Sequence, residues 1–168
     1  MTKPKCVYKG LYQHLIGSNY NNMVHIRSGQ YWENCGSEET EAYETLLEPT
    51  LKSGLAYLWE NREGGGAMGL RYLGNSNSKG GVKKETCGAG FFTDLCTLEE
   101  WSKRHRSHLA IYLGAIKHAK RFGESRKFRT WHEVSVLKQG EAVFEYINCL
   151  PQTGMIRFAS LDVVSNLV

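Results

Sequence analysis

The order in which two hydrophobic periods follow each other along this chain is the feature that most constrains its fold. Alternation with a period of two indicates strands, and recurrence at every third or fourth position indicates helices. The pattern predicts the order strand, helix, strand, strand, helix and strand, over residues 22–30, 37–62, 67–73, 87–93, 97–122 and 130–137. This β-α-β-β-α-β order predicts an α+β fold of the ferredoxin-like type, with an antiparallel sheet as in dimeric α+β barrels.

Particular residues predict the limits and the shape of the two helices. Acidic residues crowd the first turn after Ser37, where the helix dipole favours negative charge. We expect this helix to be kinked near Pro49 and Gly54, two residue types that interrupt regular helices. Thr97 and Glu100 have the spacing of a capping box, which predicts that the second helix starts there.

The segments outside these elements are predicted from turn signals and apolar positions. Residues 74–84 are rich in Asn, Ser, Lys and Gly, which predicts a flexible connection between two strands that pair as a hairpin. Near the end of the chain, we expect Phe144, Tyr146 and Ile147 to pack against other side chains.

Length and composition limit the class of protein. A chain of 168 residues with 41% hydrophobic and 23% charged residues has the profile of one globular domain. We therefore expect a single domain over residues 1–168, in which 1–20 and 141–168 are peripheral. The longest uncharged apolar stretch, 109–116, is far shorter than the ~20 residues that span a bilayer. The beginning of the chain also lacks the apolar core of a signal peptide, so we expect a cytoplasmic protein without a membrane partner.

The cysteine and histidine spacings do not favour a structural metal site. Five cysteines are an odd number, and the sequence contains no C-x-x-C pair, so we expect reduced thiols rather than a disulfide framework or a zinc site. His105 and His108 lie three positions apart and could share a metal ion. However, no third ligand has suitable spacing and no H-E-x-x-H motif occurs, so zinc is not expected.

Two patterns that could bind a nucleotide or a nucleic acid are better explained otherwise. Gly64 to Gly69 match G-x-G-x-x-G, but a helix precedes them and a strand follows, the reverse of the order in a dinucleotide-binding loop. Residues 103–129 contain nine Lys or Arg against Glu124 alone, but aromatic residues are sparse there. We interpret this segment as a solvated helix face and expect no nucleic-acid partner.

His108 stands out because it falls on the apolar stripe of its predicted helix, between Trp101 and Tyr112. One interpretation, favoured by composition alone, is a core histidine that is hydrogen-bonded to a backbone carbonyl. The other is an axial ligand to haem iron, because a neutral imidazole that projects from an apolar wall suits this role. Both interpretations are open at this point.

Two other polar residues share strand faces with apolar neighbours. His132 alternates in phase with Val134 and Val136, and Ser28 in phase with Val24 and Ile26. Taken singly, each is more often structural than catalytic.

Three long segments carry a resemblance to a known family. NNMVHIRSGQYWENC (21–35), RSHLAIYLGA (106–115) and TWHEVSVLKQGEAVFEYINCLPQTGM (130–155) resemble the haem-containing aldoxime dehydratases, which convert aldoximes to nitriles. The resemblance implies a b-type haem whose ferrous iron binds His108 on one side and the oxime nitrogen on the other. It also implies that His132 is the distal acid and base, and that Ser28 hydrogen-bonds the oxime hydroxyl.

The same resemblance implies that the chain corresponds to the C-terminal half of a longer family fold. A distal arginine of the family belongs to the other half, so we expect weak catalysis from this chain. The alternative is a truncated haem-binding module of the ferredoxin-like type, weak or inactive in catalysis, for which a homodimer could rebuild the missing wall. A small ferredoxin-like monooxygenase is a more distant alternative, and the segment FEYINCLPQTGM (144–155) favours the dehydratases instead.

Overall fold

The computed structural model describes residues 9–166, which group into two compact units. The larger unit comprises residues 24–135, and the smaller one comprises residues 9–23 with 136–166. Each unit is described by itself. The expectation of one domain over 1–168, with 1–20 and 141–168 peripheral, stays a prediction. Within residues 9–166, no helix is long and apolar enough to cross a membrane.

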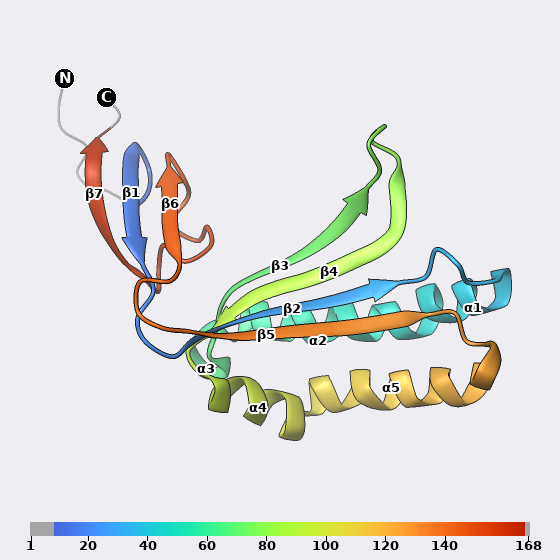
Figure 1. The fold of residues 1–168 in the computed structure, drawn as a ribbon. Coiled ribbons are helices and arrows are strands. Elements are labelled where there is room, and N and C mark those ends of the chain that lie inside the picture. The colour runs from blue at the N-terminus through green and yellow to red at the C-terminus, as the bar shows by residue number, and fades with distance from the viewer. Residues whose placement is uncertain (1–8, 167–168) are drawn as a thin grey trace. The chain divides into compact units, whose positions relative to one another are not determined.

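The larger unit is built on a four-stranded sheet with helices on one face (Figure 1). The strand order is β3-β4-β2-β5, and both the β2–β4 and the β3–β4 pairs are antiparallel. The strands are β2 (Met23–Tyr31), β3 (Ala67–Ser76), β4 (Val82–Phe92) and β5 (Arg129–Leu137). The predicted α+β fold and its β-α-β-β-α-β order are confirmed.

The first predicted helix is irregular before its proline. It comprises α1 (Ser37–Ala42), a π-helical segment η1 (Tyr43–Leu47), α2 (Glu48–Glu60) and the short α3 (Arg62–Gly65). Pro49 has no N–H to continue the α-helical pattern, and just before it the N–H of Glu48 donates to the carbonyl of Tyr43, five residues back. At Gly54 the α-helix continues without a break, and the glycine allows close packing. A Cβ there would lie 2.6 Å from Cδ1 of Ile111 on the facing helix.

The second predicted helix is two helices, α4 (Leu95–Arg104) and α5 (Arg106–Phe122), followed by the 3-10 turn η2 (Gly123–Ser125). His105 separates them with an extended backbone, at φ −79° and ψ 133°. The predicted capping box is wrong, since α4 starts earlier, at an N-cap formed by Asp94. The Asp94 side chain accepts a hydrogen bond of 2.8 Å from the N–H of Thr97.

The hairpin of β3 and β4 is longer than predicted. Both strands extend into the segment predicted to be a flexible connection, and only residues 77–81 remain between them. In this turn, Oδ1 of Asn77 accepts hydrogen bonds from the N–H groups of Lys79 and Gly81, and Gly80 has a positive φ of 80°. A local polar network therefore orders a stretch whose composition resembles that of a loop.

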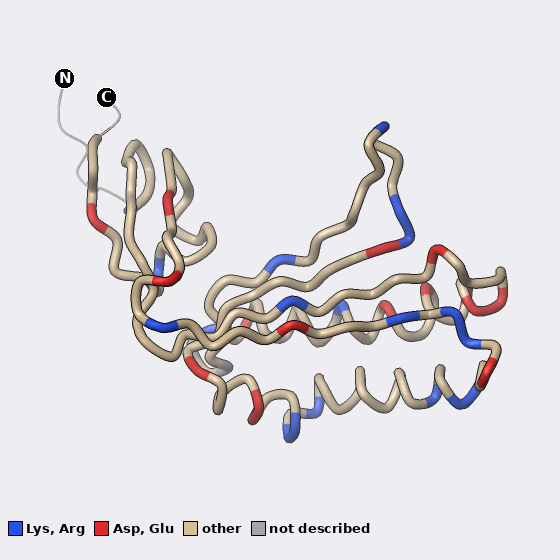
Figure 2. Tube along the Cα trace, viewed as in Figure 1, with Lys and Arg blue, Asp and Glu red and all other residues tan. Residues whose placement is uncertain are grey.

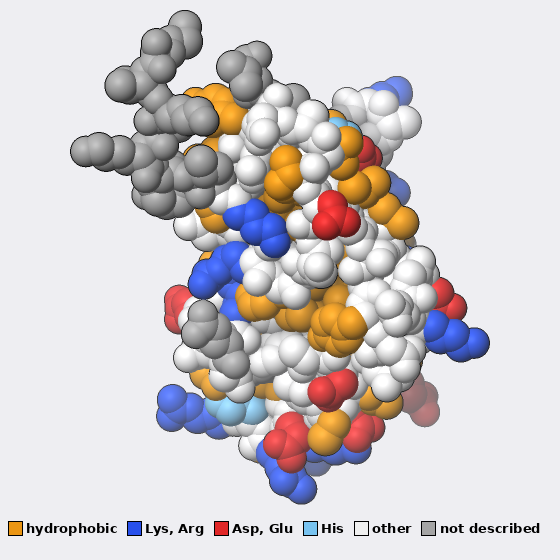
Figure 3. Space-filling model, turned by 90° about the vertical axis from the view of Figure 1, so that its left-hand side faces the viewer, with side chains coloured by type: hydrophobic (Ala, Val, Ile, Leu, Met, Phe, Trp, Pro, Cys, Tyr) orange, Lys and Arg blue, Asp and Glu red, His pale blue; other side chains and the backbone are white. Residues whose placement is uncertain are grey.

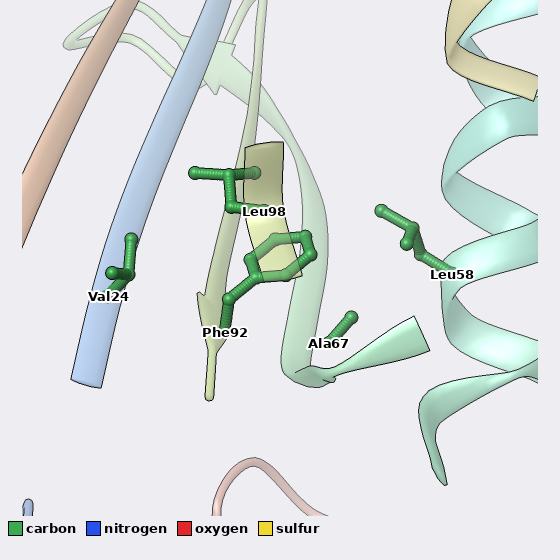
Figure 4. Close-up of a cluster of buried hydrophobic side chains, with 5 residues drawn as sticks. All are labelled: Val24, Leu58, Ala67, Phe92 and Leu98. Carbon is green, nitrogen blue, oxygen red and sulfur yellow. The ribbon is translucent and has the colours of Figure 1, made fainter. Parts of the chain in front are cut away.

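Two hydrophobic clusters join the helices to the sheet. In the first, the Phe92 ring of β4 lies among the other four buried side chains, which come from β2, α2, β3 and α4 (Figure 4): Val24, Leu58, Ala67 and Leu98. The second cluster lies where the π-helical segment meets the start of β5, and contains Trp32, Tyr43, Leu47 and Phe128. Together they fix how the helices pack on the sheet.

Basic residues of the segment 103–129 form ion pairs within the molecule. Arg121 near the end of α5 donates to the carboxylate of Glu38 in α1 at 2.9 Å, and Arg104 pairs with Glu100 at 3.0 Å. Figure 2 shows Lys and Arg residues around the end of α5 and the start of β5, where Glu38 lies nearby. On the face in Figure 3, charged side chains of both signs are interspersed.

The smaller unit is a three-stranded antiparallel sheet, in the order β6-β1-β7, that was not predicted. Its strands are β1 (Gln13–Ser18), β6 (Val143–Ile147) and β7 (Ser160–Asn166). Phe144 is buried as expected, and the hydroxyl of Tyr146 accepts a hydrogen bond of 2.8 Å from the N–H of Met155. The expectation that Ile147 packs is wrong, because its side chain is 59% exposed.

Candidate functional site

The three residues selected from the sequence line one cavity of about 440 Å³ in the larger unit. Ser28 lies on β2, His132 on β5 and His108 in the first turn of α5. The cavity lies between the sheet and the helices that cover it. Its wall is mostly apolar, with Ile26, Leu51, Leu55, Leu58, Leu70, Phe92, Leu98, Ile111 and Val134.

Ser28 is held in the sheet wall by a neighbour on its own strand. The side-chain amide of the buried Gln30 donates to the Ser28 carbonyl at 3.0 Å and to Oγ at 3.2 Å. The Gln30 amide oxygen in turn accepts from the hydroxyl of Thr86 at 2.9 Å, which fixes its orientation. Because Oγ accepts from Gln30, the hydroxyl proton of Ser28 remains available for a ligand.

Gly88 keeps the space beside Ser28 open. It is the residue opposite Ser28 on β4 and also lines the cavity. A Cβ at this position would come to 3.7 Å from a methyl group of Leu55, across the cavity wall. A side chain there would therefore occupy the space between the sheet and α2.

His108 brings a neutral ring to the helix side of the cavity. The ring is half-buried and meets Trp101 edge-on, with centroids 4.7 Å apart. Burial lowers the pKa of His108, although the nearby backbone of Ser102 acts in the opposite direction. Its Nδ1 is buried and has no hydrogen-bond partner of normal geometry among residues 9–166. The neutral form carries one free lone pair, as a metal ligand requires.

His132 occupies the sheet side of the same cavity. The residue is exposed on β5, yet the surrounding side chains displace part of the water around its ring, and this desolvation lowers its pKa. A charge on His132 also disfavours a charge on His108, which contributes to the low pKa of the latter. Both rings are therefore poised to be neutral near pH 7.

His105 is separate from this cavity, although only two residues stand between it and His108. It is not among the cavity-lining residues, and its ring stacks on Tyr57 with centroids 4.0 Å apart. In the described part of the chain, no group of three His, Cys, Asp or Glu side chains could hold a metal ion. A site made only of protein ligands, such as a zinc site, has no support in this region.

The argument that placed His108 on an apolar stripe was right about Trp101 and wrong about Tyr112. The Tyr112 side chain is 56% exposed, although it lies one turn after His108 on the same helix, α5. Trp101 contacts His108 from the preceding helix, α4, rather than from the same helix.

Sequence reasoning missed the residues that support the site. The Ser28 hydroxyl accepts a hydrogen bond from Gln30, the Trp101 indole donates to Ser107, and Gly88 leaves space beside Ser28. These contacts form only in the folded protein. For Gly88, a signal was available, since a glycine within a strand often marks a close approach.

The sequence comparisons with known proteins favour one family. The family model described as haem-containing dehydratase matches residues 1–155. The chain is 34% identical over 138 residues to a phenylacetaldoxime dehydratase of Bacillus sp. (strain OxB-1), and 36% identical over 140 residues to an aliphatic aldoxime dehydratase of Pseudomonas chlororaphis. These matches cover 82% and 83% of this chain.

The structural comparison gives the same result. A crystal structure of an aldoxime dehydratase in complex with butyraldoxime superposes with a TM-score of 0.81 and 32% identity. It covers 93% of this chain but 43% of the other. The two curated relatives are matched over 39% of their own lengths, so the chain spans about two fifths of the length of these proteins.

Proposed function

This chain belongs to the haem-containing dehydratase family, and we propose that it binds b-type haem through His108 and dehydrates an aldoxime to the nitrile. The observation that carries this proposal is the convergence of Ser28, His108 and His132 on one apolar cavity. The similar proteins named aldoxime dehydratases support it.

The residues around the cavity fit a haem. The cavity volume of about 440 Å³ is within the range of cofactor and ligand sites, and its leucine-rich wall suits a flat apolar macrocycle. His108, whose burial favours the unprotonated ring, is the residue that would hold the haem iron. When bound, the haem would supply an electron-rich ferrous iron, which would bind the oxime nitrogen and weaken the N–O bond.

His132 is the group that moves protons. The lowered pKa keeps most His132 rings neutral near pH 7 and makes the protonated ring a stronger acid. In the protonated form, the ring gives a proton to the oxime hydroxyl, which leaves as water when the N–O bond breaks. The neutral ring then takes the proton from the adjacent substrate carbon as the nitrile forms. The ring therefore ends in the protonation state in which it began. Such a transfer typically contributes 10²- to 10⁴-fold to the rate.

Ser28 orients the leaving group. Its hydroxyl oxygen accepts from Gln30, so its proton remains available to donate to the oxime oxygen. This contact fixes the hydroxyl close to the proton donor His132, which is a contribution of geometry.

The short length of this chain compared with its relatives is the reason for a second candidate function. Because the chain spans about two fifths of its relatives, it could bind haem without efficient dehydration. In that case a homodimer would be one way to complete the cavity. The open position of His132 on β5 favours this alternative, since water that enters the site weakens electrostatic catalysis.

The experiment that separates the two candidates is nitrile formation by the reconstituted chain. The protein is loaded with haem, reduced without oxygen and given butyraldoxime or phenylacetaldoxime, and the nitrile is quantified by gas chromatography. We expect nitrile above the level of free haem, reduced in Ser28→Ala and His132→Ala. Haem uptake without nitrile in any of these samples would support the binding module instead.

A further inference from the structure

The iron ligand proposed above lies where a helix is most easily frayed. His108 is the third residue of α5, and its N–H and that of Leu109 both donate to the carbonyl of His105, at 3.1 and 3.0 Å. The start of a helix is held only by its cap and its tertiary contacts. The position of the His108 ring therefore depends on what fixes the junction between α4 and α5.

Three side chains at this junction form one hydrogen-bonded chain. The indole Nε1 of Trp101 donates to Oγ of Ser107 at 3.0 Å. That Oγ lies 2.8 Å from Nδ1 of His105, and the Ser107 N–H donates to the same nitrogen at 3.3 Å. Both Ser107 donors thus point to His105, which caps α5.

A ring contact holds each end of this hydrogen-bonded row of side chains. The His105 ring stacks on Tyr57 of α2, with centroids 4.0 Å apart and planes 21° apart. The Trp101 ring meets His108 edge-on, with centroids 4.7 Å apart and planes 64° apart. Hydrogen bonds therefore connect His105, the cap of α5, to Trp101, whose ring contacts His108.

We infer that Trp101, Ser107 and His105 are positioning residues, which fix the first turn of α5 and hold the His108 ring in the orientation that binds iron. The inference rests on the proposed function in naming His108 as the ligand. The Ser107 hydroxyl carries the inference, because it accepts from the Trp101 indole and lies within hydrogen-bond distance of the His105 ring that caps α5.

Ser107 is the residue to change, because its hydroxyl contacts both Trp101 and His105. Ser107→Ala removes the hydroxyl, Ser107→Thr keeps it, and Trp101→Phe keeps a ring but removes the donor. Ser125→Ala is the matched control, since the Ser125 hydroxyl also donates locally, to the Phe122 carbonyl, but at an exposed site beyond α5.

The first measurement uses the haem-free protein. Hydrogen exchange at the His108 and Leu109 amides is expected to be about two- to twelve-fold faster in Ser107→Ala, as for the loss of one hydrogen bond that supports the His105 cap. Ser107→Thr and Ser125→Ala are expected to exchange like the parent. Parent-like exchange in Ser107→Ala, or a failure of Ser107→Thr to restore protection, would overturn the role in the first turn.

The second measurement uses the ferrous haem complex. The iron–histidine stretching band in the resonance Raman spectrum is expected to shift or broaden in Ser107→Ala and Trp101→Phe, and to be unchanged in Ser125→Ala. An unchanged band in Trp101→Phe would overturn the role of the indole. A parent protein that takes up no haem would contradict the proposed function. The exchange data would still decide whether the hydrogen bonds among Trp101, Ser107 and His105 fix the first turn of α5.

Discussion

Glu39 and His118 form a buried pair in which Oε1 of the carboxylate lies 3.3 Å from Nε2 of the imidazole. The same carboxylate accepts hydrogen bonds from the N–H groups of Lys127 and Phe128, at the start of β5. Glu39 thus ties α1 to the end of the helix that carries His108, and to the strand that carries His132.

We expect Glu39→Ala to destabilise the protein strongly. It leaves two N–H groups and a buried histidine without their acceptor, and each buried donor left unsatisfied costs about 1–3 kcal/mol. The free energy of unfolding in urea measures the effect. Glu38→Ala is the matched control, since its exposed pair with Arg121 is worth less than about 1 kcal/mol. Equal losses in the two variants would contradict this account of Glu39.

The pKa of Glu39 also predicts how the free energy of unfolding depends on pH. Burial alone would raise the pKa of Glu39, but the N–H groups of Phe128 and Lys127 outweigh it and hold the pKa below its ordinary value of 4.5. Because the folded pKa is depressed, the stabilisation is present above pH 4.5 and is lost as the pH falls through the folded pKa. Glu39→Gln should flatten this part of the curve of unfolding free energy against pH. The same slope in parent and variant would assign it to other carboxylates.

Gly29→Ala is expected to displace the strand that carries His132. A Cβ at Gly29 would lie 1.9 Å from the ring of Trp131, the residue next to His132 on β5. Such overpacking costs about 1–3 kcal/mol and should shift tryptophan fluorescence. Gly74→Ala is the control, because a Cβ there has no described atom within 4 Å. A parent-like spectrum and stability in Gly29→Ala would show that β5 can adjust freely.

His132→Ala should separate binding from chemistry. The haem Soret band should persist, because the ring is not the proposed axial ligand, while nitrile formation should fall by about 10²- to 10⁴-fold. If the variant turned over at the parent rate, another group would have to supply the proton.

The sequence predicted the larger unit well because its elements are long and periodic. The four strands and the order of the helices follow from hydrophobic alternation, which burial on one sheet face enforces. The strands of the smaller unit were missed, since β1 and β6 are short and pair only through distant segments such as Leu15 with Tyr146.

Local sequence signals did not predict the features that depend on tertiary contacts. Glu39 resembles an ordinary acid in a helix first turn, and nothing near it in the sequence indicates that it accepts from residues 127 and 128. The break at His105 was also not predicted, since no proline or glycine marks it and its cap depends on a side chain. Ser28, His108 and His132 stood out by their apolar neighbours in the sequence, but their roles come from the resemblance and stay predictions.

The most direct test of the central claim is a haem titration of the parent, His108→Gly and His14→Ala, followed by the Soret band of the ferrous form. The parent and His14→Ala, in which the changed residue lies in the smaller unit, are expected to bind haem alike. His108→Gly should lose the band of the histidine-ligated form and regain it when imidazole is added, because free imidazole can occupy the space of the missing ring. A His108→Gly variant with the affinity and spectrum of the parent, without added imidazole, would contradict the assignment of His108 as the iron ligand.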